Sequence, residues 1–61
     1  MIYSKVLAYC EQKDLSIRQF EMKCGLANGT VSKWKDGGNP SLSTLLKIEQ
    51  FTKISAKKWL Q

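Results

Sequence analysis

The segment from Ser16 to Trp34 constrains the fold of this chain more than any other stretch of the sequence. It reads SIRQFEMKCGLANGTVSKW, with apolar residues at helical spacing on both sides of Gly25. Serine is a common helix N-cap, and glycine supplies the positive φ that a tight helix exit needs. The pattern predicts two successive short helices, one beginning after Ser16 and ending at Gly25, the other over about residues 27–35.

The flanking sequence predicts further helices on both sides of this pair. Apolar residues between Ile2 and Lys13 recur at three- and four-residue steps, which is typical of an amphipathic helix. The breaker run 36–40 precedes Ser41, which we expect to cap a fourth helix with Leu42, Leu45, Leu46 and Ile48 on its apolar side. A short last helix is expected over about residues 54–60. The sequence therefore predicts one compact all-α domain of five helices over residues 1–61.

Length and composition exclude several classes of protein. Sixty-one residues leave no room for a separate catalytic or ligand-binding lobe. The chain has no histidine and no nucleophile–base spacing, so we expect no enzyme, no metal, no cofactor and no small-molecule ligand. No stretch approaches the roughly 20 apolar residues of a membrane span, and no signal peptide is visible, so we expect a cytoplasmic protein.

The charge balance indicates the kind of partner. Ten Lys and Arg residues against five Asp and Glu residues give a formal net charge of +5. This excess favours an anionic partner such as nucleic acid, although many small basic domains bind none. The two cysteines, Cys10 and Cys24, fall on apolar helix faces, so we expect them to be small core residues rather than a disulfide or zinc ligands.

The predicted third helix has an apolar side and a polar side. Val31 and Trp34 define its inward face at helical spacing. The outward positions carry short polar groups and a lysine, namely Asn28, Gly29, Ser32 and Lys33, with Thr30 on the flank. Asparagine can pair with adenine through two hydrogen bonds, and lysine can donate to guanine. We therefore predict that this side reads base edges in the major groove of double-stranded DNA.

Simpler interpretations of the same residues remain open. Asn28 could cap the third helix, which would compete with a base contact. Ser32 could be a neutral surface residue, and Lys33 and Lys35 could be solvated charges. The joint pattern favours base reading, because inward apolar and outward hydrogen-bonding residues coincide behind a glycine turn.

Phosphate contacts are expected on both sides of the reading helix. Backbone N–H groups at a helix start attract anions, and the glycine loop before Ser41 would leave backbone amides uncovered unless it is merely a connector. Asp36 counts against this placement, because a carboxylate repels phosphate. The residues predicted to contact phosphates are Ser16, Arg18, Gln19, Lys35, Gly37, Gly38, Asn39 and Ser41.

Nearly the whole chain resembles the phage-repressor, Cro and Xre type of helix-turn-helix regulator. The resemblance rests on GLANGTVSKW (Gly25 to Trp34), which is especially similar to phage-type repressors of Gram-positive bacteria, and on NPSLSTLLKI (Asn39 to Ile48). It implies a lambda-repressor-like domain with a helix-turn-helix formed by its second and third helices, acting as a two-fold dimer on a pseudo-palindromic operator. It also adds Ala27 to the base readers and Ile17 to the backbone contacts.

Three positions depart from the family's pattern. Ile17 stands where many members have a phosphate-contacting glutamine, and Ala27 replaces the usual serine cap of the recognition helix. Glu21 occupies a position often filled by alanine. We hypothesise that Glu21 accepts N–H groups at the start of the third helix, in place of the missing cap. The alternative is a half-buried glutamate whose carboxylate reaches solvent.

The predicted function is sequence-specific DNA binding by a transcriptional regulator, acting as a repressor. Phe51, Ile54 and Trp59 are candidates for a self-complementary dimerisation patch, unless they pack within the monomer. The alternative function is a protein-interaction module on the same fold, antirepressor-like or antitoxin-like, that binds no operator.

Overall fold

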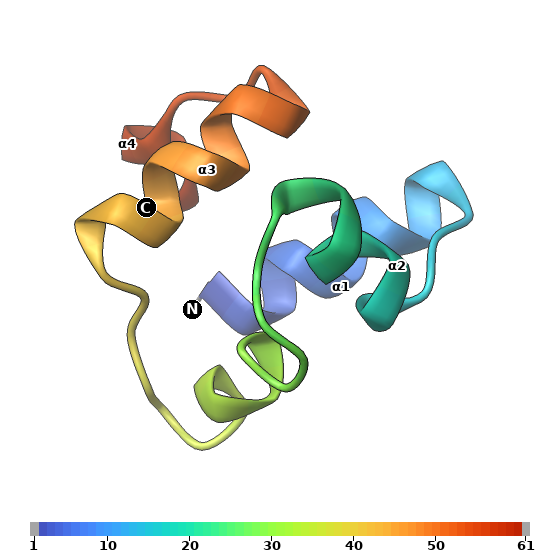
Figure 1. Cartoon of the computed structure of the whole chain (residues 1–61), viewed down its shortest axis with the longest axis horizontal. Helices are drawn as coiled ribbons and strands as arrows, with labels where there is room; N and C mark the ends of the chain where they lie inside the picture. Colours follow the sequence, from blue (N-terminus) through green and yellow to red (C-terminus); the bar gives the residue numbers. More distant parts are fainter. Residues whose placement is uncertain (1, 61) are drawn as a thin grey trace.

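The computed structural model describes residues 2–60 as four α-helices and one short 3₁₀ helix (Figure 1). In chain order the elements are α1 (Ile2–Lys13), α2 (Ile17–Cys24), η1 (Val31–Trp34), α3 (Leu42–Thr52) and α4 (Ala56–Trp59). The predicted all-α domain is confirmed, but the five-helix description is corrected. What the sequence predicts as a third helix over about residues 27–35 is a turn followed by the single 3₁₀ turn η1.

The starts of α2 and α3 and the end of α2 follow the predicted capping residues. The Ser16 hydroxyl accepts the N–H of Gln19 at 3.0 Å, and the Gln19 side chain accepts the N–H of Ser16 at 2.9 Å. This reciprocal pair is a capping box. Gly25 ends α2 at φ +78°, and the Ser41 hydroxyl accepts the N–H of Thr44 at the start of α3.

One hydrophobic core joins all five elements. An aromatic cluster lies at its centre, where Tyr9 of α1 meets Phe20 of α2 edge-on at a ring-centroid distance of 5.8 Å. The rings of Trp59 of α4 and Phe51 of α3 also meet the Tyr9 ring edge-on, at centroid distances of 6.0 and 6.4 Å. Edge-to-face packing of this kind adds to the energy of burial. The buried core residues are Ile2, Val6, Cys10, Phe20, Cys24, Leu26, Val31, Trp34, Leu45, Ile48 and Trp59.

The cysteines behave as the predicted core residues. Cys10 and Cys24 are buried and free. Burial raises the pKa of both thiols, and the nearby Cys10 adds to the shift that brings the pKa of Cys24 to about 11. Both side chains are therefore protonated at neutral pH and poorly nucleophilic.

Helix α3 buries a narrower stripe than the sequence predicts. Leu45 and Ile48 are buried three residues apart, whereas Leu42, 69% exposed, and Leu46 face outward. Only one face of a helix meets the core, and successive residues are about 100° apart around the axis, so Leu46 turns away from the face that buries Leu45. At the other end of α3, Glu49 accepts the N–H of Ala56 at 2.8 Å and so ties α4 to α3. Within residues 2–60, no helix has the length and apolar character needed to cross a membrane.

Candidate nucleic-acid interface

The connection from α2 to η1 determines the shape of the predicted interface. Leu26 anchors it in the core, and Gly29 takes a φ of +86° in the left-handed region, which a right-handed helix does not contain. Gly29 is therefore the physical reason why the predicted third helix is shortened to η1. The hydroxyl and the N–H of Thr30 both donate to the carbonyl of Ala27, at 2.7 and 3.2 Å, and close the turn before η1. We call residues 27–35 the reading segment.

Glu21 of α2 joins the reading segment to the first helix of the pair. One carboxylate oxygen accepts the N–H of Gly29 at 3.3 Å, and the other accepts the N–H of Val31 at 2.9 Å. The side chain is 2% exposed, and the guanidinium of Arg18 lies 3.9 Å away. The hypothesis that Glu21 replaces the missing cap is confirmed, and the solvent-reaching alternative is wrong. The capping alternative for Asn28 is wrong as well, because Thr30 holds the cap position of η1 and Glu21 takes the N–H groups around it.

The predicted base readers differ in how far they are exposed. Val31 and Trp34 are buried beneath it, as expected from their spacing. Gly29 and Thr30 are half-buried, and the Thr30 hydroxyl hydrogen is engaged by the Ala27 carbonyl. The exposed members of the set are Ala27, Asn28, Ser32 and Lys33, with Lys35 directly after η1. Their polar groups are thus available to an outside partner.

The start of α2 offers fewer free groups than its sequence indicates. In the capping box, the Ser16 hydroxyl oxygen and the Gln19 side-chain oxygen Oε1 each already accept a backbone N–H. The Ser16 hydroxyl hydrogen and the Gln19 side-chain NH₂ remain as possible donors to a phosphate. Arg18 adds a guanidinium on a side chain that is about half exposed.

The loop after η1 is packed more closely than a plain connector. The N–H of Gly37 donates to the Trp34 carbonyl at 3.2 Å, so the prediction that its amide is uncovered is corrected. A Cβ on Gly38 would lie 2.5 Å from the Lys33 carbonyl oxygen, so only glycine fits there without a backbone shift. Sequence reasoning missed this close approach, because nothing local to Gly38 indicates which backbone lies beside it. Asn39 and Ser41, further along, are exposed.

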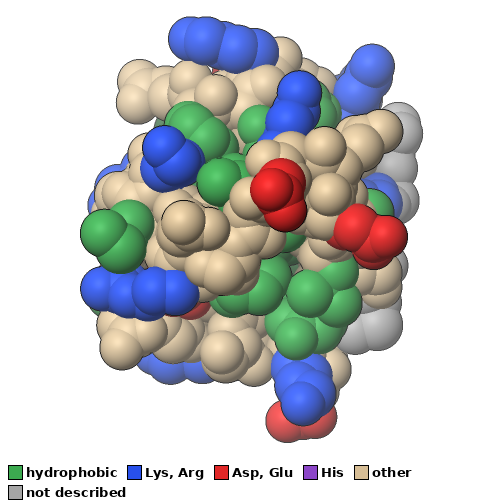
Figure 2. All heavy atoms as spheres, turned by 90° about the vertical axis from the view of Figure 1, so that its right-hand side faces the viewer, with side chains coloured by type: hydrophobic (Ala, Val, Ile, Leu, Met, Phe, Trp, Pro, Cys, Tyr) green, Lys and Arg blue, Asp and Glu red, His purple; other side chains and the backbone are tan. Residues whose placement is uncertain are grey.

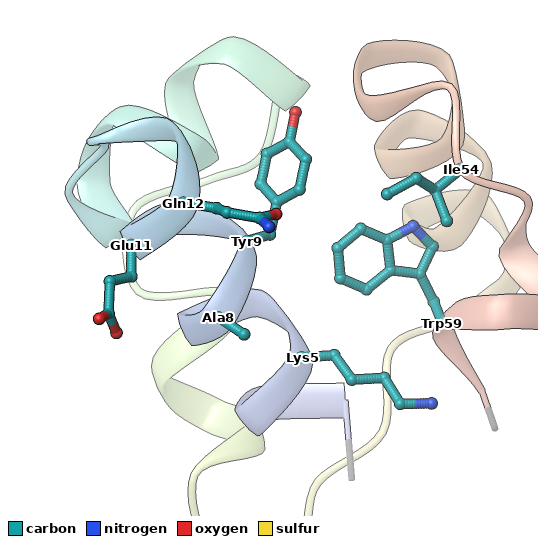
Figure 3. Close-up of a pocket in the computed structure, with 7 residues that line it drawn as sticks. All are labelled: Lys5, Ala8, Tyr9, Glu11, Gln12, Ile54 and Trp59. Atoms are coloured by element: carbon teal, nitrogen blue, oxygen red, sulfur yellow. The ribbon is translucent and has the colours of Figure 1, made fainter.

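The three dimerisation candidates differ in how deeply they are buried. Trp59 is 3% exposed and packs within the chain, whereas Phe51 and Ile54 are half-buried. Trp59, Ile54 and Tyr9 line a hollow of about 660 Å³ between α1 and the segment that leads into α4 (Figure 3). The indole N–H of Trp59 is buried there and finds no hydrogen-bond acceptor among residues 2–60. Only Phe51 and Ile54 keep surface that a second chain could cover.

Basic side chains are distributed rather than concentrated. On the face nearest the α1–α2 connection, lysine and arginine side chains ring the surface, with acidic side chains and apolar patches between them (Figure 2). In the part of the chain that the structure describes, no three His, Cys, Asp or Glu residues group to hold a metal ion. On the face that Figure 2 shows, the basic side chains are therefore spread out rather than gathered in one cluster.

A helix, a glycine turn and a second short element with an exposed polar side define a helix-turn-helix protein. The helix-turn-helix family matches residues 6–59 of this chain, from α1 to the last residue of α4. The chain belongs to this family, which is of the Cro and Xre type. Comparison with curated proteins and with solved structures gave no match. The family's domain is a non-enzymatic DNA-binding module, which implies DNA as the partner and a role in regulating transcription.

Proposed function

We propose that this chain is a transcriptional repressor that places its reading segment in the major groove of a specific operator. One observation carries the proposal: Asn28, Ser32 and Lys33 are exposed in the same short segment that buries Val31 and Trp34, directly after a helix-turn connection. Side chains that donate and accept hydrogen bonds on a rigid support are what base-edge reading requires.

Each residue of the surface has its own chemistry toward DNA. The amide of Asn28 both donates and accepts, which matches N6 and N7 of adenine, and the ammonium of Lys33 donates to O6 and N7 of guanine. The hydroxyl hydrogen of Thr30 is used within the turn, which leaves its methyl group for a thymine methyl. Gly29 and Ala27 carry no large side chain and allow the backbone to approach the groove closely.

Phosphate contacts fix the register on the DNA. Arg18 and Gln19 precede the reading segment in the chain, and Lys35, Asn39 and Ser41 are at its end or follow it, all of them exposed. We assign these donors to the phosphate strands that border a major groove. The acceptor-only carboxylate of Asp36 contributes nothing to such a contact.

Operator binding is proposed to use two copies of the chain. A single module of this size covers about 600–1,000 Å² of its surface on DNA, which limits the sequence it can read. A two-fold dimer would place two reading segments about 34 Å apart on a pseudo-palindromic site. The exposed parts of Phe51 and Ile54 are the apolar surface offered for the contact.

The second candidate is a protein-interaction module of the antirepressor or antitoxin-like kind. It is favoured by the shortness of η1, which is four residues long, and by Asp36 beside the reading segment. Salt separates the two candidates. Binding through phosphates weakens steeply as salt rises, because it depends on counterion release, whereas docking through apolar contacts is far less sensitive.

The test is selection of bound sequences from a pool of random duplexes, repeated at two salt concentrations. A repressor of this kind enriches one motif with two-fold related half-sites, and its affinity falls steeply at the higher salt. Retention of all sequences alike at low salt would contradict operator recognition. In that case the interaction module would be the better description.

A further inference from the structure

We propose that Glu21 is a positioning residue for base reading, a role that rests on the DNA binding proposed above. Its carboxylate is 2% exposed and lies beneath the reading segment, so it does not itself reach a DNA base. It acts by fixing the backbone of the segment from inside the protein, and sequence discrimination depends on the geometry that it imposes.

The contacts of Glu21 fall in the middle of the reading residues. Its two oxygens hold the N–H groups of Gly29 and Val31, one on each side of Thr30. Asn28 directly precedes this clamp, and Ser32 directly follows it. Fixing two N–H groups two residues apart fixes the backbone between them. One side chain on α2 therefore helps to set the relative position of the base readers before and after Thr30, together with the turn that Thr30 closes on Ala27.

Only a carboxylate satisfies both N–H groups. Glutamate presents two acceptor oxygens, whereas glutamine of nearly the same shape presents one oxygen and one NH₂ group. With glutamine at this position, one of the two backbone N–H groups would face a donor. Glu21→Gln therefore removes one arm of the clamp while keeping the volume and the polarity of the side chain.

The charge of Glu21 gives its role a distinctive signature. A buried negative charge repels DNA phosphates, and the guanidinium of Arg18, 3.9 Å from the Glu21 carboxylate, opposes this repulsion. Glu21→Gln has two effects: it removes the repulsion of DNA phosphates, and it loosens the reading segment. Affinity for unrelated DNA is then unchanged or higher, whereas affinity for the operator falls. Simple loss of folded protein would instead lower both affinities together.

Glu49 provides a matched control. It is a second glutamate whose carboxylate accepts a backbone N–H, that of Ala56 at 2.8 Å, and it lies on α3 away from the reading segment. Glu49→Gln makes the same chemical change and should cost some thermal stability. Because its contact joins α3 to α4, it should leave the preference for the operator unchanged.

The experiment compares the full chain with these two variants. Affinity is measured for the selected operator and for an unrelated duplex of equal length, with unfolding curves to correct for the folded fraction. Glu21→Gln should lower the ratio of the two affinities roughly tenfold, as expected for losing one hydrogen bond to a charged group. Glu49→Gln should leave the ratio as it is. An unchanged ratio in Glu21→Gln, or equal losses on both duplexes, would overturn the proposal.

Amide hydrogen exchange supplies a readout that needs no DNA. The N–H groups of Gly29 and Val31 should both be protected in the parent chain, and one of the two should lose its protection in Glu21→Gln, with core amides unchanged. Equal protection in both chains would overturn the clamp itself. If the parent chain prefers no sequence, operator recognition fails. The exchange measurement still tests the clamp in that case, because it does not depend on DNA.

Discussion

Helix α2 and the reading segment are neighbours in the chain, yet their backbone groups are satisfied in opposite ways. Helix α2 carries its own start and stop: Ser16 and Gln19 form its capping box, and Gly25 closes its end. The reading segment has one local turn, closed by Thr30 on the Ala27 carbonyl, but its Gly29 and Val31 N–H groups are held by Glu21, eight and ten residues earlier. The difference teaches that the scaffold is specified by local sequence, whereas the reading surface is specified by packing.

The contrast has an energetic side. A helix cap acts on one turn and contributes about 1 kcal/mol. The reading segment instead depends on two buried side chains below it and on one carboxylate beside it. Damage to any of these should spread beyond the residue that is changed. Three pairs of substitutions test this contrast, each with one member in the reading segment or its support.

The largest effect is expected at Trp34, the side chain that anchors η1 in the core at 3% exposure. Trp34→Ala should cost about 3–5 kcal/mol, since it removes a large buried ring and leaves a cavity. Urea denaturation followed by circular dichroism measures this loss. Leu42→Ala, at a 69% exposed leucine on α3, should stay within about 0.5 kcal/mol of the parent. Similar losses in both variants would break the assignment of Trp34 to the core.

A middle-sized effect is expected at Glu21. Glu21→Ala leaves two backbone N–H groups without their charged acceptor, so the free energy of unfolding should fall by about 2–3 kcal/mol. Ser16→Ala removes a local cap and should cost about 1 kcal/mol. Thermal and urea unfolding of the two variants, measured side by side, rank the losses. A Ser16 variant less stable than the Glu21 variant would reverse the comparison between local and tertiary support.

The smallest effect on stability is expected at the two glycines of the connection. Gly25 and Gly29 both have positive φ, and a Cβ at either position would meet nothing within 4 Å. Alanine at either position should therefore cost only the backbone strain, about 1–2 kcal/mol, and asparagine should cost less. Equilibrium unfolding should give similar losses for the two alanine variants. Duplex selection should separate them, because only Gly29→Ala reshapes the reading segment. Altered preference in Gly25→Ala alone would contradict this.

Much of the scaffold follows from local sequence signals. The start of α2 at Ser16, its end at Gly25 and the inward pair Val31 and Trp34 each depend on residues close in the chain, and each was predictable. The clamp by Glu21 was also within reach, because a glutamate at a close-packed position is unusual enough to require a partner.

The remaining features depend on contacts that the sequence does not display. The sequence places Gly29 among the outward residues of a continuous third helix, but its left-handed conformation ends any helix at that point. Gly38 is fixed by a carbonyl of η1, and Leu46 is 49% exposed although Leu45 beside it on α3 is buried. In each case the deciding neighbour is tertiary, so periodicity and propensity alone cannot identify it.

The most direct test of base reading compares Asn28→Ala with Lys35→Ala in the same duplex selection. Asn28 is proposed to read one base, so its loss should cost about 1–3 kcal/mol at a single base-pair position and leave the rest of the motif intact. Lys35 is proposed to contact phosphate, so its loss should weaken all sequences alike and reduce the salt slope by about 1. Equal losses for both variants, blind to sequence, would contradict the claim that the reading segment fits against base edges.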